Sequence, residues 1–166
     1  MVVIRPAFER DLEKLSEIAI LCFPKDFVDE IGIENTPKNA LKWVKEDHRR
    51  TNYAGYHVAK EDGVLVGYIF HEMMGGLSGN VELKQIGVHP DYRGRGIGKK
   101  LILESEKNWK EYLGEMFGKK PYKMLLTTSE TNDKAHNLYA SCGFKPETKI
   151  NKLFWDSDEE IWVKEL

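Results

Sequence analysis

Glycines and cationic residues alternate in one short stretch of the chain, residues 93–100, which reads RGRGIGKK. Glycine allows backbone conformations in which several N–H groups converge on one anion. A helix that begins at the same place adds unpaired N–H donors and the positive end of its dipole. The side chains of Arg93, Arg95 and Lys99 would add charge around that anion, although in an ordinary tight turn they would simply be solvated. The stretch therefore predicts a phosphate-binding turn.

A strand and a helix must hold such a turn in place. The residues before it favour a strand, with apolar side chains at Val81, Leu83, Ile86 and Val88. Pro90 ends this strand, because proline has no N–H to donate to a sheet. A helical pattern then starts at Ile97 and continues to Phe117. Strand, glycine-rich turn and helix thus follow one another in the order that a phosphate site requires.

The spacing of the glycines excludes two common nucleotide motifs. A P-loop requires G-x-x-x-x-G-K-[ST] and a dinucleotide-binding turn requires G-x-G-x-x-G, and Lys99 stands where each pattern needs its last glycine. The stretch does fit R-x-x-G-x-G at Arg93, Gly96 and Gly98, after I-G-V-H-P-x-Y. It resembles the signature of the GNAT superfamily of acetyl-CoA-dependent N-acetyltransferases, in which this turn holds the pyrophosphate of coenzyme A.

That resemblance implies acetyl-CoA, released as coenzyme A, as the co-substrate. In the family, strand backbone groups pair with the pantetheine arm, which here implies Ile86, Gly87 and Val88. The residues implied for the pyrophosphate are Arg93, Gly94, Arg95, Gly96, Ile97, Gly98 and Lys99. The backbone of the turn is a better candidate than its arginine side chains, because the glycine pattern acts on backbone conformation. The resemblance also implies the amide N–H of Val88 as the donor that polarises the thioester carbonyl.

A second segment, Ser129–Phe144, resembles the family's pattern of an asparagine, a short helix with a tyrosine, and Gly-Phe. The resemblance implies that Tyr139 points at the coenzyme A sulfur and protonates the departing thiolate. A phenol with a pKa of about 10 keeps its proton at neutral pH and can stabilise the thiolate of a thiol with a pKa of about 8.5, by hydrogen bonding or by proton transfer. Tyr139 also fits a core tyrosine whose hydroxyl bonds to backbone. Asn132 is implied as a cofactor contact, with a helix N-cap as the alternative.

Glu82, on the strand before the turn, is the candidate general base. An amine must be neutral to attack a thioester, and a carboxylate could take its proton directly or through water. Several GNAT enzymes carry a glutamate on this strand. The alternative is a surface glutamate paired with Lys84, since period-two alternation puts both residues on one face. His89 and His136 are further candidates for the base.

Neither cysteine is a candidate nucleophile. Cys22 and Cys142 both fall on inward helical faces and fit core residues. We therefore expect direct attack of the amine on the thioester, with most of the rate coming from the positioning of the two substrates. Two cysteines without a C-x-x-C pair predict reduced thiols and a cytoplasmic protein. The histidines are scattered without ligand spacing, which predicts no metal site.

The composition is typical of a soluble globular protein. At 166 residues the chain has the length of one domain, so we predict a single N-acetyltransferase domain spanning 1–166. A formal net charge of −2 gives no reason to expect nucleic acid or an anionic membrane as a partner. No apolar run has membrane-spanning length, and residues 1–11 lack the pattern of a secretory signal. Strand-edge homodimers are common in the family.

The pattern along the chain predicts the order β-α-α-β-β-β-α-β-α-β-β. The expected strands cover 2–6, 53–60, 64–72, 81–88, 123–128 and two segments after 144, and the expected helices cover 9–22, 37–50, 97–117 and 133–142. The inward side of the helix 97–117 should carry Leu101, Ile102, Ser105, Trp109, Tyr112 and Met116. The fold class is therefore α/β, a mixed, mostly antiparallel twisted sheet of about six to seven strands with helices on both faces. This is also the element order of the GNAT fold.

Two acidic segments bear on the acceptor. Residues 25–35 and 156–160 each carry four carboxylates, and in the family the corresponding loops wall the acceptor site. A negative rim would steer cations, so we expect a cationic amine, namely a polyamine, a lysine side chain or a protein N-terminus. Ordinary solvated turns are the alternative for both segments. For the whole chain, the alternative is a coenzyme A-binding sensor or interaction module without turnover.

Overall fold

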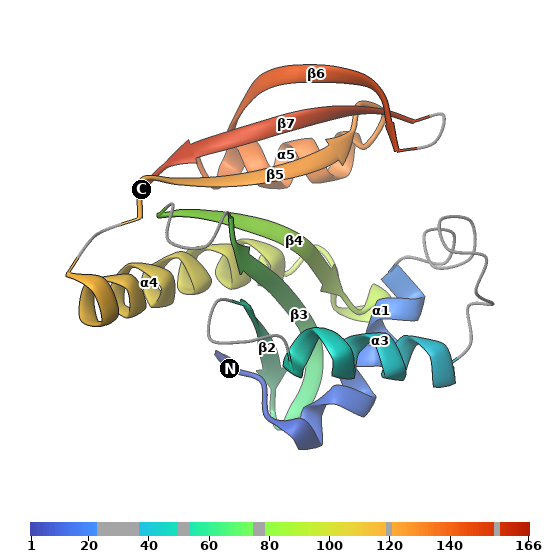
Figure 1. Ribbon diagram of the computed structural model, residues 1–166. Helices are drawn as coiled ribbons and strands as arrows, with labels where there is room; N and C mark the ends of the chain where they lie inside the picture. The colour runs from blue at the N-terminus through green and yellow to red at the C-terminus, as the bar shows by residue number, and fades with distance from the viewer. Residues whose placement is uncertain (23–36, 50–53, 75–78, 119–120, 155–156) are drawn as a thin grey trace. The chain divides into compact units, whose positions relative to one another are not determined.

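The computed structural model describes residues 1–22, 37–49, 54–74, 79–118, 121–154 and 157–166. Its sheet has seven strands in the order β1-β2-β3-β4-β5-β7-β6. The strands are β1 (Val2–Pro6), β2 (Ala54–Glu61), β3 (Val64–Met73), β4 (Asn80–Val88), β5 (Lys123–Ser129), β6 (Lys145–Phe154) and β7 (Ser157–Glu165). The α-helices of these ranges are α1 (Leu12–Cys22), α3 (Pro37–Arg49), α4 (Ile97–Phe117) and α5 (Asp133–Ser141) (Figure 1). The acidic segment 25–35 and Asp156 lie outside the described residues.

The strand pairing confirms the predicted fold class. β1 runs antiparallel to β2, and both β5 and β6 run antiparallel to β7, whereas β4 and β5 are parallel. The predicted elements are present close to their expected bounds, and α4 matches its prediction at both ends. Between β2 and β3, Asp62 and Gly63 have φ of 50° and 85°, the positive values that a tight Asp-Gly hairpin turn requires.

Two details of the helices differ from the sequence prediction. Met116 was expected on the inward side of α4 but is 57% exposed, and Leu113 is buried there instead. The buried face runs from Trp109 to Leu113, which are four residues apart and lie on the same side of the helix. Met116 lies outside this face. The first helix was expected from Glu9, but Glu9–Asp11 form a 3₁₀ turn and the α-helix begins at Leu12.

The described residues form two compact units, 1–70 with 85–101 and 71–84 with 102–166. β3, β4 and α4 each contribute residues to both units. The single domain spanning the chain stays a prediction. None of the described helices combines the length and the apolar character that crossing a membrane requires.

The first unit has a core between two helices and two strands. Helices α1 and α3 lie side by side (Figure 1), and their apolar residues pack with those of β2 and β3. The cluster includes Leu12, Leu15, Ile18, Ala40, Val44, Tyr56, Val58, Leu65, Tyr68 and Phe70. At the start of α1, Asp11 is 4% exposed and accepts hydrogen bonds from the Arg5 guanidinium (2.7 and 2.9 Å) and the Phe8 amide (2.8 Å). This core supports the strand end and turn that were predicted to bind phosphate.

The second unit has its own core around β5 and β7. Helix α5 lies against these two strands (Figure 1), with Tyr139 near Phe144 and Trp162. Met124 and Leu126 of β5 and Trp109 and Leu113 of α4 are also buried. Lys164 of β7 forms an ion pair with Glu106 of α4, which ties the strand to that helix. This core fixes the short helix that carries the predicted acid.

Candidate active site

The glycine-rich turn of the first unit has the backbone conformation that its sequence predicts. Gly94 and Gly96 have φ of +77° and +75°, in the left-handed region that side chains other than glycine rarely adopt. A Cβ added at either residue would meet nothing within 4 Å. Glycine is therefore required at these two positions by backbone conformation, and crowding plays no part.

The N–H groups of this turn are open. The first bond of α4 runs from the Lys100 amide to the Gly96 carbonyl, at 3.1 Å. Within the described part of the chain, no protein oxygen accepts from the amides of residues 94–99. Unpaired donors at the start of a helix attract an anion, and the helix dipole adds to that attraction. The turn thus has the geometry of a phosphate cradle.

The two arginines of the turn are used within the protein. The Nε of Arg93 donates to the Val88 carbonyl at 3.0 Å, and its guanidinium lies 3.7 Å from the Cys22 sulfur. Arg95 pairs with Glu61 at 3.2 Å and donates to the Asp91 carbonyl at 3.0 Å. Both side chains therefore brace the turn, which favours backbone amides over arginine side chains as the anion ligands. Their predicted cofactor contacts stay predictions.

The end of β4 is closely packed at Gly87. A Cβ there would lie 2.7 Å from Cε1 of Tyr68 and 3.1 Å from the Cys22 sulfur, so only glycine fits. Ile86 and Val88 on either side are half-buried. Burial raises the pKa of the Cys22 thiol, so this cysteine is a poor nucleophile.

The register between β4 and β5 ends early. It comprises Asn80–Lys123, Val81–Met124 and Glu82–Leu125, although β4 itself continues to Val88. The backbone contacts predicted for Ile86 and Val88 would use that later part of β4.

Tyr139, in the second unit, has a buried ring. It is 6% exposed, and its ring centroid lies 6.0 Å from that of Phe144 and 6.4 Å from that of Trp162. Among the described residues, no group forms a hydrogen bond with its hydroxyl. Burial raises the pKa of Tyr139 to about 12, so the phenol holds its proton at neutral pH. The phenol is thus protonated at neutral pH and able to donate a hydrogen bond.

Two other predicted site residues of this unit have partners that match their alternative roles. The Asn132 side chain accepts the Ala135 amide at 3.3 Å and caps α5. Glu82 forms an ion pair with Lys84 at 3.1 Å, on the solvent-accessible face of β4. Neither contact tests a role with substrate bound, so the cofactor contact of Asn132 and the base role of Glu82 stay predictions.

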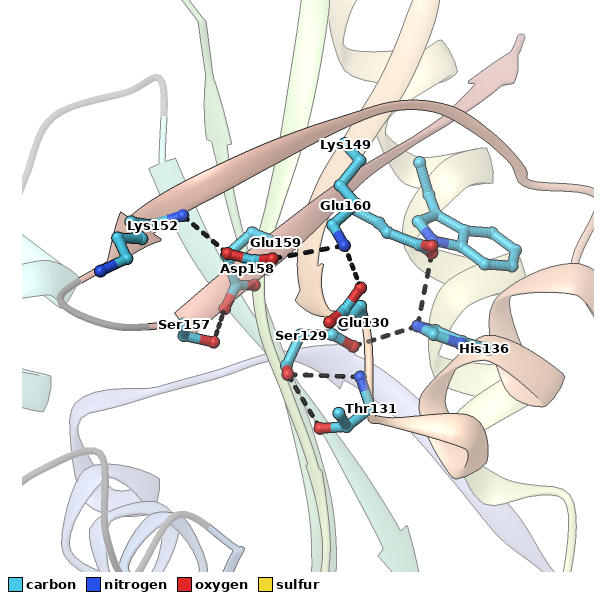
Figure 2. Close-up of polar contacts among 11 residues, drawn as sticks. Ser129, Glu130, Thr131, His136, Lys149, Lys152, Ser157, Asp158, Glu159 and Glu160 are labelled. Atoms are coloured by element: carbon cyan, nitrogen blue, oxygen red, sulfur yellow. Dashed lines mark hydrogen bonds and ion pairs between the residues drawn. The ribbon is translucent and has the colours of Figure 1, made fainter.

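A cluster of contacts around α5 and β7 was not foreseen. The Nε2 of His136 lies 3.1 Å from the Ser129 carbonyl and 3.6 Å from the Glu160 carboxylate (Figure 2). The His136 ring also stacks on Trp162, with centroids 5.1 Å apart. The spacing of His136 and Tyr139 puts them on one face of the helix, and Glu160 and Trp162 alternate onto one face of the strand. The sequence does not show that these two faces pack against each other.

Comparison with known proteins gives one consistent result. Residues 12–144 match the acetyltransferase (GNAT) family. An N-alpha-acetyltransferase of Sulfurisphaera tokodaii is 30% identical in an alignment of 137 positions that covers 76% of this chain and 77% of that protein.

Solved structures share the fold over almost the whole chain. The PaiA N-acetyltransferase of Thermoplasma acidophilum, in complex with coenzyme A, has a TM-score of 0.71 at 21% identity and covers 100% of this chain and 99% of its own. The spermidine N-acetyltransferase of Vibrio cholerae, in complex with coenzyme A and spermine, has a TM-score of 0.74 at 19% identity, with coverage of 99% and 95%.

Proposed function

The chain belongs to the acetyltransferase (GNAT) family and is an acetyl-CoA-dependent N-acetyltransferase, and from this premise we propose that its acceptor presents a single ammonium group, as the α-amine of a peptide or protein N-terminus does. The observation that carries the proposal is the charge balance of the β6–β7 hairpin, which was expected to form a negative rim for a cation.

Two carboxylates near the tip of the hairpin, Asp158 and Glu160, are already engaged by other side chains. Asp158 lies 3.3 Å from the Lys149 ammonium and accepts the Lys152 amide at 2.9 Å (Figure 2). Lys149 also pairs with Glu130. Glu160 accepts the Trp162 indole N–H at 2.8 Å and faces His136. Both carboxylates are thus engaged within the protein before an acceptor arrives, which favours a small cation over a polycation.

Glu159 differs from its neighbours. It is 8% exposed and accepts the Ser157 hydroxyl at 2.7 Å, and within the described residues it has no cationic partner. A buried carboxylate without a countercharge is unfavourable, so a ligand cation would stabilise it. One such carboxylate matches one ammonium group, whereas a polyamine carries several.

The pairing of Glu82 also suits an α-amine. The Glu82 carboxylate already contacts the Lys84 ammonium at 3.1 Å, so it is partly engaged before an acceptor arrives. An α-amine, with a pKa of about 8, is roughly one-tenth neutral at pH 7, whereas a lysine-like amine, with a pKa of about 10.4, is neutral in fewer than about one molecule in a thousand. An α-amine therefore needs a weaker base than a lysine or a polyamine does. The N-alpha-acetyltransferase relative supports the same choice.

The proposed reaction is a direct acyl transfer. The amine nitrogen attacks the thioester carbonyl carbon, the C–S bond breaks, and the thiolate takes a proton from Tyr139. Glu82 receives the proton of the amine, directly or through water, and exchange with solvent then returns Glu82 to the carboxylate and Tyr139 to the phenol. The open amides of residues 94–99 hold the pyrophosphate, and backbone groups of Ile86–Val88 align the pantetheine arm. The Val88 N–H polarises the carbonyl.

An acceptor panel tests the proposal. Thiol release from acetyl-CoA is measured with a lysine-free peptide that has a free N-terminus, the same peptide with a blocked N-terminus and an internal lysine, and spermidine. Mass spectrometry then locates the acetyl group. We expect the free N-terminus to have the highest kcat/KM. A preference for spermidine, the second candidate because a solved structure of the same fold holds spermine, would overturn the assignment of a monocation.

A further inference from the structure

We infer that Glu160, Trp162 and His136 form a clamp that aims the hydroxyl of Tyr139, and that Glu160 is a positioning residue for the acyl transfer. The inference rests on the proposed role of Tyr139 as the acid. It concerns only the second unit, from which all four residues come.

The strand side of the clamp is a fixed indole. Glu160 and Trp162 are two residues apart on β7 and therefore project from the same face. The Trp162 Nε1–H donates to Glu160 Oε2 at 2.8 Å, and Trp162 is 7% exposed. A charge-assisted hydrogen bond at that distance sets the rotation of the indole as well as its depth.

The helix side of the clamp is a pair of rings on α5. His136 and Tyr139 are three residues apart and share one helical face. The imidazole stacks on the Trp162 indole with centroids 5.1 Å apart and planes at 25°, and the phenol ring packs at 6.4 Å and 56° on the same indole. Because one indole supports both rings, its rotation affects both.

His136 also faces the Glu160 carboxylate, so the three residues of the clamp contact one another. The His136 Nε2 faces two acceptors, the Ser129 carbonyl at 3.1 Å and Glu160 Oε2 at 3.6 Å (Figure 2). A ring nitrogen that faces only acceptors must carry the hydrogen. His136 therefore donates to the end of β5 while its ring holds the indole in place.

Tyr139 needs such a clamp because its hydroxyl has no hydrogen-bond partner among the described residues. Most buried tyrosines are oriented by a bond at the hydroxyl. Here the ring contacts with Trp162 and Phe144 are what determine where the hydroxyl points. A displacement of an ångström at a reacting group can cost about a hundredfold in rate.

Truncation and conservative replacement of Glu160 separate positioning from mere stability. Glu160→Ala removes the indole acceptor, whereas Glu160→Gln keeps an oxygen there. We expect Glu160→Ala to lower kcat at least tenfold with KM for acetyl-CoA within twofold, and Glu160→Gln to restore most of kcat. Trp162→Phe keeps an aromatic ring but loses the indole N–H, so we expect a loss of kcat between those of the two Glu160 variants. If Glu160→Ala does not fold, Trp162→Phe tests the inference in its place.

Glu106→Ala is the matched control. It removes a carboxylate that pairs with Lys164 of the same strand and Lys110, and α5 is not among its partners. We expect Glu106→Ala to lower the unfolding midpoint at least as much as Glu160→Ala does, with kcat within twofold of wild type. An equal loss of kcat in both variants would overturn the inference.

A double-mutant cycle shows whether Glu160 acts through Tyr139. In a Tyr139→Phe background, Glu160→Ala should lower kcat by less than twofold, because the hydroxyl to be aimed is gone. Losses that multiply would reject positioning. A loss in Tyr139→Phe with full activity in Glu160→Ala would reject the clamp and leave the acid intact. Unchanged kcat in Tyr139→Phe would reject the acid role itself, and the inference with it.

Discussion

The turn at 93–98 and the contact between α5 and β7 place functional groups by opposite means. In the turn, the ligating groups are backbone amides, and two glycines with positive φ determine their direction. Around α5, the functional group is one phenol, and its direction depends on the packing of Trp162 and Phe144. The first arrangement is local in sequence, whereas the second needs elements far apart in the chain. Changes to the turn should therefore alter binding, and changes around α5 should alter turnover.

Tyr139→Phe should produce the largest effect and tests the second half of this comparison. The variant keeps the ring and its packing but removes the proton donor, so kcat should fall by about 10²- to 10⁴-fold. Coenzyme A affinity, measured by calorimetry, should stay within twofold. Because the pKa of Tyr139 is about 12, the wild-type kcat should also show no loss from ionisation of this phenol up to pH 10. A large loss of affinity would mean that the residue serves binding.

Gly96→Val tests the first half. A β-branched residue at φ +75° costs about 1–3 kcal/mol or reshapes the turn, so coenzyme A affinity should fall by roughly 10- to 100-fold. Gly114→Ala is the matched control, since that glycine lies inside α4 and an added Cβ meets nothing within 4 Å. The control should keep full affinity. Unchanged affinity in Gly96→Val would show that the amides do not bind the pyrophosphate.

Asp11 allows the stability of the first unit to be changed without a substitution in the turn at 93–98. Its hydrogen bond with Arg5 is the main cause that lowers the pKa of Asp11 from 3.8 to about 2. Because the folded-state pKa is the lower one, the ionised group stabilises the fold above pH 4, and this contribution, up to about 2 kcal/mol, is lost as the pH falls from 4 to 2. Asp11→Asn should reduce the free energy of unfolding at pH 7.

Urea denaturation at several pH values measures this effect. Between pH 5 and pH 2.5 the wild type should lose more stability than Asp11→Asn, because the variant has no carboxylate to protonate. Coenzyme A affinity of the folded protein at pH 7 should be equal in the two proteins. Parallel stability curves would remove Asp11 as the cause of the acid sensitivity.

Glu82→Gln should have the smallest effect, a loss of kcat/KM of about tenfold or less. The loss should be greatest at the lower end of the active pH range, where the acceptor is mostly an ammonium ion. Lys84→Gln is the informative companion, since it frees Glu82 from its 3.1 Å ion pair and should leave kcat/KM equal or higher. A loss that is flat across pH would remove Glu82 from the mechanism.

The sequence predicted the turn and its flanking elements because each depends on neighbouring residues. Glycine spacing specifies backbone conformation directly, and the bounds of α4 follow from Ile97 and Gly118 at its ends. The α/β class followed from the order of the elements, and the family match agrees with it. The catalytic roles of Tyr139 and Glu82 remain proposals that came from resemblance.

The partners of the charged residues could not be predicted, because they depend on register and on contacts between distant segments. Arg95 pairs with Glu61, which is 34 residues away in the sequence. The pairing of β6 with β7 shifts between Ile150 and Phe154, so the position opposite Glu160 could not be counted from the turn. For the same reason the sequence predicted a negative rim at the hairpin and could not show that Lys149 pairs with Asp158.

The tight fit at Gly87 means that substitutions at positions 68 and 87 depend on each other. A methyl group at 87 would overlap the ring of Tyr68, so a library that randomises 87 alone should return only glycine. A library that randomises 68 and 87 together should also return alanine at 87, paired with a smaller residue at 68. A side chain at position 87 should therefore appear only after the residue at position 68 has become smaller, with a small adjustment of the Cys22 sulfur.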